Sequence, residues 1–177
     1  MKHILIILLF LLGGISQINA QCSYNITASL LHQDSLASGD FRLYPRLNAP
    51  ACNINELDKP IIFVETFDFL NEQSAVQTYT LLNQPVSGSN VGAISSLRLL
   101  GYDVIILNFD DATNYIQSNA FLLIELINQI NNSKISNEEL TIIGHGMGGV
   151  VARYALAYME EHNMPRNRTL CFFRCST

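Results

Sequence analysis

The sequence predicts an α/β domain in which a parallel sheet carries helices on both of its faces. Short, continuous apolar runs of the kind found in buried strands occur at residues 61–64, 104–107, 140–143 and 170–173. Helical stretches separate these runs, and strands that alternate with helices at short intervals favour stacked βαβ units. In such sheets ligands bind beyond the carboxyl ends of the strands, so we expect the functional residues in the loops there.

The helical stretches are recognised by their apolar periodicity and their stop signals. Residues 115–131 carry apolar side chains three and four positions apart, which is typical of an amphipathic helix. Residues 93–100 form a shorter helical stretch that ends at Gly101, a residue suited to a helix C-terminus. Residues 150–161 predict a further helix after the third apolar run.

The first twenty residues have the layout of a secretory signal peptide. Lys2 supplies a positive charge, residues 4–12 are an unbroken apolar run, and Ala20 offers a small residue for cleavage. The apolar run is shorter than the roughly 20 residues that a bilayer-spanning helix needs, so we expect no stable membrane anchor. The chain is therefore predicted to be exported to the periplasm or the extracellular space.

The remaining chain divides into an N-terminal lead, residues 21–58, and a partial α/β domain, residues 59–177. The lead is polar and rich in turn residues, with short strands expected near 24–31 and 41–44 that form a small antiparallel edge. Two of the four cysteines, Cys22 and Cys52, lie in the lead and are a plausible disulfide pair in an exported protein.

Composition narrows the range of partners. The formal net charge of −5 disfavours binding to a phosphate backbone, so we expect no nucleic-acid partner. Cys171 and Cys175 lack partners at the spacing of common zinc sites. We expect no metal and no cofactor, and the oligomeric state is left open.

The glycine cluster at residues 144–149 has three interpretations. Gly144, Gly146 and Gly149 fit the dinucleotide fingerprint G-x-G-x-x-G, but two βα units precede it and no acidic residue follows the next strand. The cluster could also be a glycine-rich turn without chemistry. The third interpretation is a nucleophile elbow, G-x-S-x-G, in which Gly144 and Gly148 allow a sharp strand-to-helix turn.

The wider sequence favours the elbow. Residues 59–65 with Phe67 and Asp68, residues 101–105 and residues 140–154 together resemble the α/β-hydrolase superfamily, in its exported bacterial lipase- and esterase-like branch. The resemblance implies an α/β-hydrolase-like fold, of which this chain carries the N-terminal part. It places Gly146 at the position of the nucleophilic serine.

The resemblance also implies further site residues. The N–H of Met147 would be one oxyanion donor, and a second would come from the loop near Phe67, with Thr66 as the other candidate. Gly144, His145, Gly148 and Gly149 complete the elbow, with His145 as a packing neighbour and not a catalytic base.

Two departures from the family weigh against activity. Glycine at position 146 has no hydroxyl, and the catalytic acid and histidine follow the serine in this fold, beyond the strands that this chain contains. The unusual end of the sequence suggests a C-terminally truncated or frameshifted product. Other acidic residues and histidines are expected to be solvated or to cap turns: Asp68, Asp103, Asp110, Asp111, His32 and His162.

The sequence thus predicts an exported protein of carboxylic ester hydrolase lineage that is inactive as given. One alternative is a noncatalytic exported binding protein on the same fold, whose partner is an acyl-ester or lipid-like small molecule. The other is a nucleotide-binding protein that uses Gly144, Gly146 and Gly149.

Overall fold

A computed structural model describes residues 21–50, 52–85, 88, 90–165 and the backbone of 169–174. The proposed signal peptide, residues 1–20, lies outside the described residues. The elements are the strands β1 Cys22–Thr27, β2 Ser38–Tyr44, β3 Lys59–Val64, β4 Tyr102–Phe109, β5 Leu140–His145 and β6 Thr169–Arg174, the helices α2 Ala75–Leu82, α3 Ala93–Leu99, α4 Ile116–Ser133 and α5 Met147–Glu161, and the 3-10 turn η1 Ile54–Glu56.

The strands form one mixed sheet in the order β1-β2-β4-β3-β5-β6. Strands β3, β4, β5 and β6 run parallel, which confirms the predicted parallel sheet. Strands β1 and β2 join it as an antiparallel pair beside β4, so the expected antiparallel edge in the lead is also confirmed. Both strands of the lead therefore belong to the same sheet as the strands that follow residue 59.

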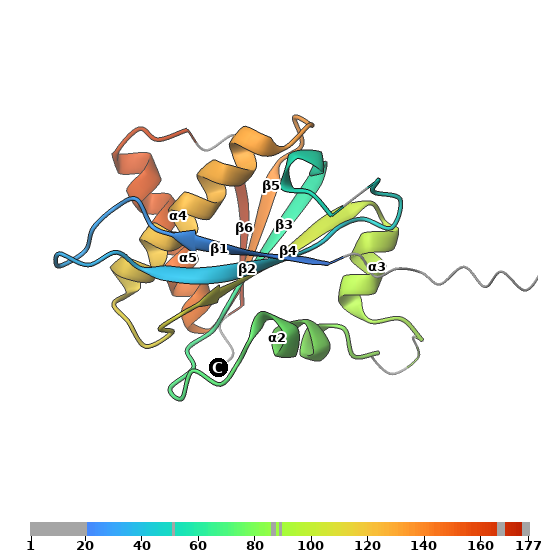
Figure 1. Cartoon of the computed structure of the whole chain (residues 1–177), viewed down its shortest axis with the longest axis horizontal. Coiled ribbons are helices and arrows are strands. Elements are labelled where there is room, and N and C mark those ends of the chain that lie inside the picture. The colour runs from blue at the N-terminus through green and yellow to red at the C-terminus, as the bar shows by residue number, and fades with distance from the viewer. Residues whose placement is uncertain (1–20, 51, 86–87, 89, 166–168, 175–177) are drawn as a thin grey trace, which may run out of the picture.

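Helices cover both faces of the sheet, as Figure 1 shows. On one face α4 and α5 pack on a large apolar core whose central side chains include Ile62, Leu107 and Ile142. On the other face α2 and α3 cover a smaller cluster that contains Val104 and Ile106. Alternate residues of β3 and β4 thus enter opposite cores, which is why these strands read as continuous apolar runs.

The helix boundaries follow local signals. Helix α2 begins at a capping box in which Ser74 and Gln77 satisfy each other's backbone N–H groups. The predicted helix at 115–131 is confirmed as α4, and the predicted stop at Gly101 is confirmed by its φ of 89° directly after α3. Helix α5 begins three residues earlier than predicted, at Met147. No helix in the described part of the chain is long and apolar enough to cross a membrane.

A disulfide bond links two parts of the lead, and a buried carboxylate joins the lead to the rest of the chain. Cys22 and Cys52 form the expected disulfide bond. Asp103, at the start of β4, is fully buried and forms an ion pair with Arg46 at 2.9 Å, while it also accepts the Asp58 N–H at 2.7 Å. The expectation that Asp103 is a solvated or turn-capping residue is therefore wrong, because its carboxylate joins the lead to the sheet from within the core.

Candidate functional site

The turn at residues 144–149 lies at the carboxyl tip of β5, a central strand between β3 and β6. His145 ends the strand, Gly146 is the N-cap of α5, and Met147 begins the helix. Gly146 has φ 56° and ψ −123°, a mirror image of extended backbone that glycine adopts at little cost. The chain therefore reverses from strand to helix at a single residue, as an elbow requires.

Two further glycines let the helix approach the sheet closely. A Cβ atom on Gly144 would lie 2.5 Å from the backbone nitrogen of Gly149. A Cβ atom on Gly148 would lie 2.3 Å from the carbonyl oxygen of Glu65 and 2.6 Å from that of Val64. Since backbone atoms cannot move aside cheaply, both positions need glycine for the first turn of α5 to pack on β3 and β5.

The other elbow residues differ in their exposure. Gly148 and Gly149 are buried in the first turn of α5, whereas Met147 is 37% exposed. His145, expected to be a packing neighbour, is instead exposed at the end of β5. Because a helix has no internal acceptor for the N–H groups of its first turn, the start of α5 presents donors beside Gly146.

The loop after β3 lies against the elbow. A Cβ atom built on Gly146 would come within 2.9 Å of the Thr66 hydroxyl oxygen. Phe67 follows Thr66 and is 48% exposed, and its neighbour Phe69 is 77% exposed. The structure therefore brings the two segments of the predicted oxyanion site together, and Thr66 is the residue of this loop closest to the empty side-chain position.

Glu65 is a buried carboxyl group at the end of β3. It is 3% exposed, and its Oε2 accepts the Phe109 N–H at 2.7 Å, while Oε1 has no hydrogen-bond partner. Burial, reinforced by the negative charges of Asp68 and Asp40, raises the pKa of Glu65 to about 7, although the Phe109 bond opposes the shift. Near neutral pH this side chain exists in both its protonated and its ionised form.

A cleft of about 390 Å³ opens beside these residues. Glu65 and Thr66 contribute polar groups, and Gly144 and His145 connect the cleft to the elbow. Much of its wall is apolar and comes from β3, β5 and α2: Phe63, Val64, Leu81, Leu82 and Ile143. An apolar cleft with few polar groups is the usual form of a small-molecule site.

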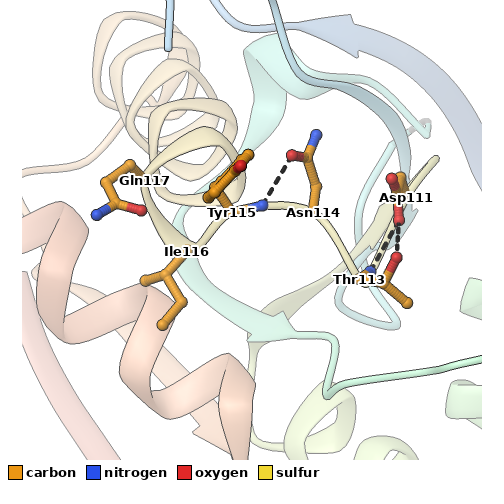
Figure 2. A pocket seen from close by; sticks show the side chains of 6 residues that line it. All are labelled: Asp111, Thr113, Asn114, Tyr115, Ile116 and Gln117. Atoms are coloured by element: carbon orange, nitrogen blue, oxygen red, sulfur yellow. Dashed lines mark hydrogen bonds between the residues drawn. The ribbon is translucent and has the colours of Figure 1, made fainter. Parts of the chain in front are cut away.

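A second hollow, of about 530 Å³, lies between β4 and α4 (Figure 2). Its polar side chains are bonded within their own turn: Asp111 accepts the N–H and the hydroxyl of Thr113, and the Asn114 side chain accepts the Tyr115 N–H. These bonds stabilise the approach to α4. The cleft beside the elbow, in contrast, is lined by Glu65, whose buried carboxyl group has one oxygen without a hydrogen-bond partner, so this cleft is the stronger candidate site.

Asp68, Asp111 and His162 each make contacts within their own segment of the chain. Asp68 accepts the Gln73 N–H and Asp111 accepts from Thr113, so both cap turns as expected. His162 ends α5 and stacks on Tyr158 with ring centroids 3.8 Å apart. Within the described residues, no group of three or more His, Cys, Asp or Glu side chains could hold a metal ion.

Comparison with known proteins agrees with this architecture. The family model "Putative serine esterase (DUF676)" matches residues 117–177, which include the elbow. A bacterial heroin esterase superposes with a TM-score of 0.52 at 11% identity, over 97% of this chain and 49% of that one. A mutant of the rice cell wall degrading esterase LipA from Xanthomonas oryzae superposes with a TM-score of 0.53 at 14% identity, over 80% and 38%. No curated protein matches the chain.

The chain has the α/β-hydrolase fold. At these identities the structural matches establish the α/β-hydrolase fold and not a particular substrate. The chain spans about half the length of the heroin esterase and less of LipA. The glycine pattern predicted the strand-to-helix turn at 144–149, whereas the only local signal for Glu65 is a charged residue at the end of an apolar strand.

Proposed function

We propose that this chain descends from a carboxylic ester hydrolase and binds an acyl-ester or lipid-like small molecule without cleaving it. One observation carries the proposal: the backbone at Gly146 has the turn of a nucleophile elbow, yet residue 146 has no hydroxyl. An unusual backbone conformation at a strand tip is a pointer to a functional site. The serine-esterase family match across the elbow supports the same lineage.

The site would hold an ester by its carbonyl end. The N–H of Met147, at the start of α5, and an N–H of the loop at Thr66 or Phe67 would donate to the carbonyl oxygen. The positive end of the α5 dipole would favour partial negative charge at the same place. The alkyl chain would lie along the apolar wall of the cleft, against Leu81 and Leu82.

Cleavage would fail at its first step. A serine hydrolase requires a hydroxyl that attacks the carbonyl carbon and a base that accepts its proton. Gly146 has no hydroxyl that could attack the carbonyl carbon. Removal of the serine in a well-studied protease lowers turnover by roughly 10⁶. We therefore infer that binding survives where catalysis does not.

We also propose that the protein is exported. The charge of Lys2 and the apolar run at 4–12 suit a signal peptide, and the Cys22–Cys52 disulfide suits an oxidising compartment. Mass spectrometry of the protein from its native host would find an N-terminus near Gln21. A mature protein that begins at Met1 would contradict export by this route.

Binding and cleavage are tested on one sample. We expect the wild-type protein to bind the methyl ester of dansyl-labelled undecanoic acid, seen as a rise in fluorescence, and to release no nitrophenol from nitrophenyl butyrate above the buffer rate. The variant Gly101→Ser serves as the matched control for Gly146→Ser below. It adds a hydroxymethyl group at another glycine with positive φ, where no atom lies within 4 Å of the added Cβ. Absence of binding refutes the binding function, and wild-type turnover refutes the inactivity.

The lineage has its own test. Gly146→Ser would be introduced into a chain extended through the downstream coding sequence, with Gly101→Ser in the same chain as control. Ester hydrolysis that depends on Ser at 146 would support descent from a hydrolase. Its absence in a folded, extended chain would contradict it.

A further inference from the structure

The cleft beside the strand-to-helix turn contains a carboxyl group that the protein itself satisfies only in part. Glu65 lines this cleft from the end of β3 and is almost fully buried. Its Oε2 accepts the Phe109 N–H at 2.7 Å, while its Oε1 is buried without a hydrogen-bond partner. Because a buried polar atom without a partner lowers stability, a ligand that supplies a donor to this oxygen would gain affinity.

We propose that the cleft binds an amphiphilic amine, whose ammonium group pairs with the Glu65 carboxylate and whose alkyl chain lies along the apolar wall. This inference rests on the proposed function in that it uses the same cleft for a lipid-like molecule, and it adds the charge of that molecule. It requires neither a carbonyl group in the ligand nor the N–H groups at the start of α5. Binding is noncovalent, so no bond forms or breaks.

The charges around Glu65 favour a cation over a neutral donor. Burial, and after it the negative charges of Asp68 in the loop after β3 and of Asp40 on β2, raise the pKa of Glu65 to about 7, against the opposing effect of the Phe109 hydrogen bond. Neither lysine nor arginine occurs among the described residues that line the cleft. An ammonium group would balance this negative charge as well as donate a hydrogen bond, whereas a hydroxyl group would only donate.

The backbone of Glu65 is fixed on two sides, which orients the carboxyl group before a ligand arrives. The Glu65 N–H donates to the Leu107 carbonyl of β4 at 3.3 Å. The Glu65 carbonyl oxygen lies against Gly148 in the first turn of α5. Together with the side-chain bond to Phe109, these contacts hold the residue between a strand and a helix. Binding therefore requires little further ordering of this side chain, which favours affinity.

The rest of the cleft suits an alkyl chain. Leu81 and Leu82 of α2 face Phe63 and Ile143 of the sheet across a volume of about 390 Å³. Leu81 is 62% exposed, so an alkyl chain beside it would cover apolar surface that water now contacts. Removal of such surface from water is favourable for binding.

The first experiment compares three ligands of equal chain length by isothermal titration calorimetry at pH 8: octylamine, octan-1-ol and octanoate. An alkylamine carries its proton at this pH, as a lysine side chain does. We expect octylamine to bind about tenfold to hundredfold more tightly than octan-1-ol, as for a hydrogen bond between charged groups. Octanoate should bind more weakly than octan-1-ol, because its charge is repelled. Equal Kd values for octylamine and octan-1-ol would overturn the inference.

The second experiment repeats these titrations on two variants. Glu65→Gln keeps the shape of the side chain and can still accept the Phe109 N–H, but it removes the charge. Octylamine and octan-1-ol should then bind within about twofold of each other, and binding of octan-1-ol shows that the cleft is intact. Glu72→Gln is the matched control, since it removes an exposed carboxylate from the same loop, and it should keep the wild-type preference. A preference for octylamine that persists in Glu65→Gln would overturn the role of Glu65.

The third experiment counts protons released when octylamine binds at pH 7, by titration in buffers of different ionisation enthalpy. Since the pKa of Glu65 is about 7, an ammonium group that pairs with it should ionise the carboxyl group and release about half a proton per ligand. His145 is the titratable residue of β5 that lines the same cleft, so His145→Gln tests its contribution. The release should persist in His145→Gln and vanish in Glu65→Gln. The reverse pattern, or no release from the wild type, would overturn the pairing.

These outcomes separate the inference from the function beneath it. If the wild-type protein binds the dansyl ester and octan-1-ol without preferring octylamine, the binding function stands and the ammonium site is wrong. If it binds octylamine but not the dansyl ester, the ammonium site stands and ester binding is wrong. If it binds none of these ligands, both proposals fail.

Discussion

Replacement of Glu65 by glutamine should change how the stability of the protein depends on pH. Burial raises the pKa of this carboxyl from 4.5 to about 7, so the folded protein holds a proton that the unfolded chain releases. Between about pH 4.5 and pH 7 the folded state therefore binds more protons than the unfolded state. Stability from this group is fully present below pH 4.5 and falls as the pH rises to 7.

The size of the effect follows from the two pKa values. The interval from 4.5 to about 7 corresponds to about 3 kcal/mol in the free energy of unfolding. Glutamine has nearly the same shape, carries no charge at any pH, and can still accept the Phe109 N–H with its amide oxygen. The stability of Glu65→Gln relative to wild type should therefore increase by about 3 kcal/mol between pH 4 and pH 8.

Urea unfolding at constant ionic strength, in steps from pH 4 to pH 8, measures this difference directly. The same series with Glu72→Gln, an exposed residue in the loop after β3, reports the effect of losing a surface carboxyl group. A difference between Glu65→Gln and wild type that stays constant over the whole range would refute the reasoning. It would mean that Glu65 titrates alike in the folded and unfolded states.

Three further predictions concern the packing that holds the site. Gly148→Ala should lower the free energy of unfolding by about 3 kcal/mol or more, since the added Cβ meets backbone oxygens. The control Gly101→Ala, whose added Cβ lies in open space, should lower it by about 1–2 kcal/mol. Equal losses in urea titrations of the two variants would contradict this. Replacing Cys22 and Cys52 by serine opens a link across 30 residues and should cost about 3–4 kcal/mol, and an unchanged unfolding midpoint would be inconsistent with it. Asp103→Asn should cost about 3 kcal/mol, because the partly buried Arg46 guanidinium loses the carboxylate that pairs with it, and a much smaller loss in calorimetry would contradict this.

Local pattern was sufficient for most elements of this fold. The apolar runs at 61–64, 104–107 and 140–143 became the cores of β3, β4 and β5, each extended by two residues at one or both ends. The periodicity of 115–131 became α4. These features are readable because burial on two faces, or on one helical stripe, imposes its period on neighbouring residues of a single segment.

Glycine spacing also predicted the strand-to-helix turn at 144–149, because the turn itself demands small residues at fixed positions. Gly144 and Gly148 are needed where helix and strand backbones touch, and Gly146 is needed where φ is positive. Such demands appear in the sequence as a short motif. The contacts of Gly144 lie within residues 144–149, whereas Gly148 is required by the approach of α5 to Val64 and Glu65 at the end of β3.

Tertiary structure alone decided three features of the molecule. Asp103 was expected at the surface, but the pairing of β2 with β4 brings Arg46 to it within the core. Glu65 gained its raised pKa only when β4 and the loop after β3 excluded water around it. Thr66 and Gly146 are 80 residues apart and meet only because β3 and β5 are neighbours in the sheet. A sequence pattern records what one segment needs, whereas charge burial and contacts between loops depend on which strands become neighbours.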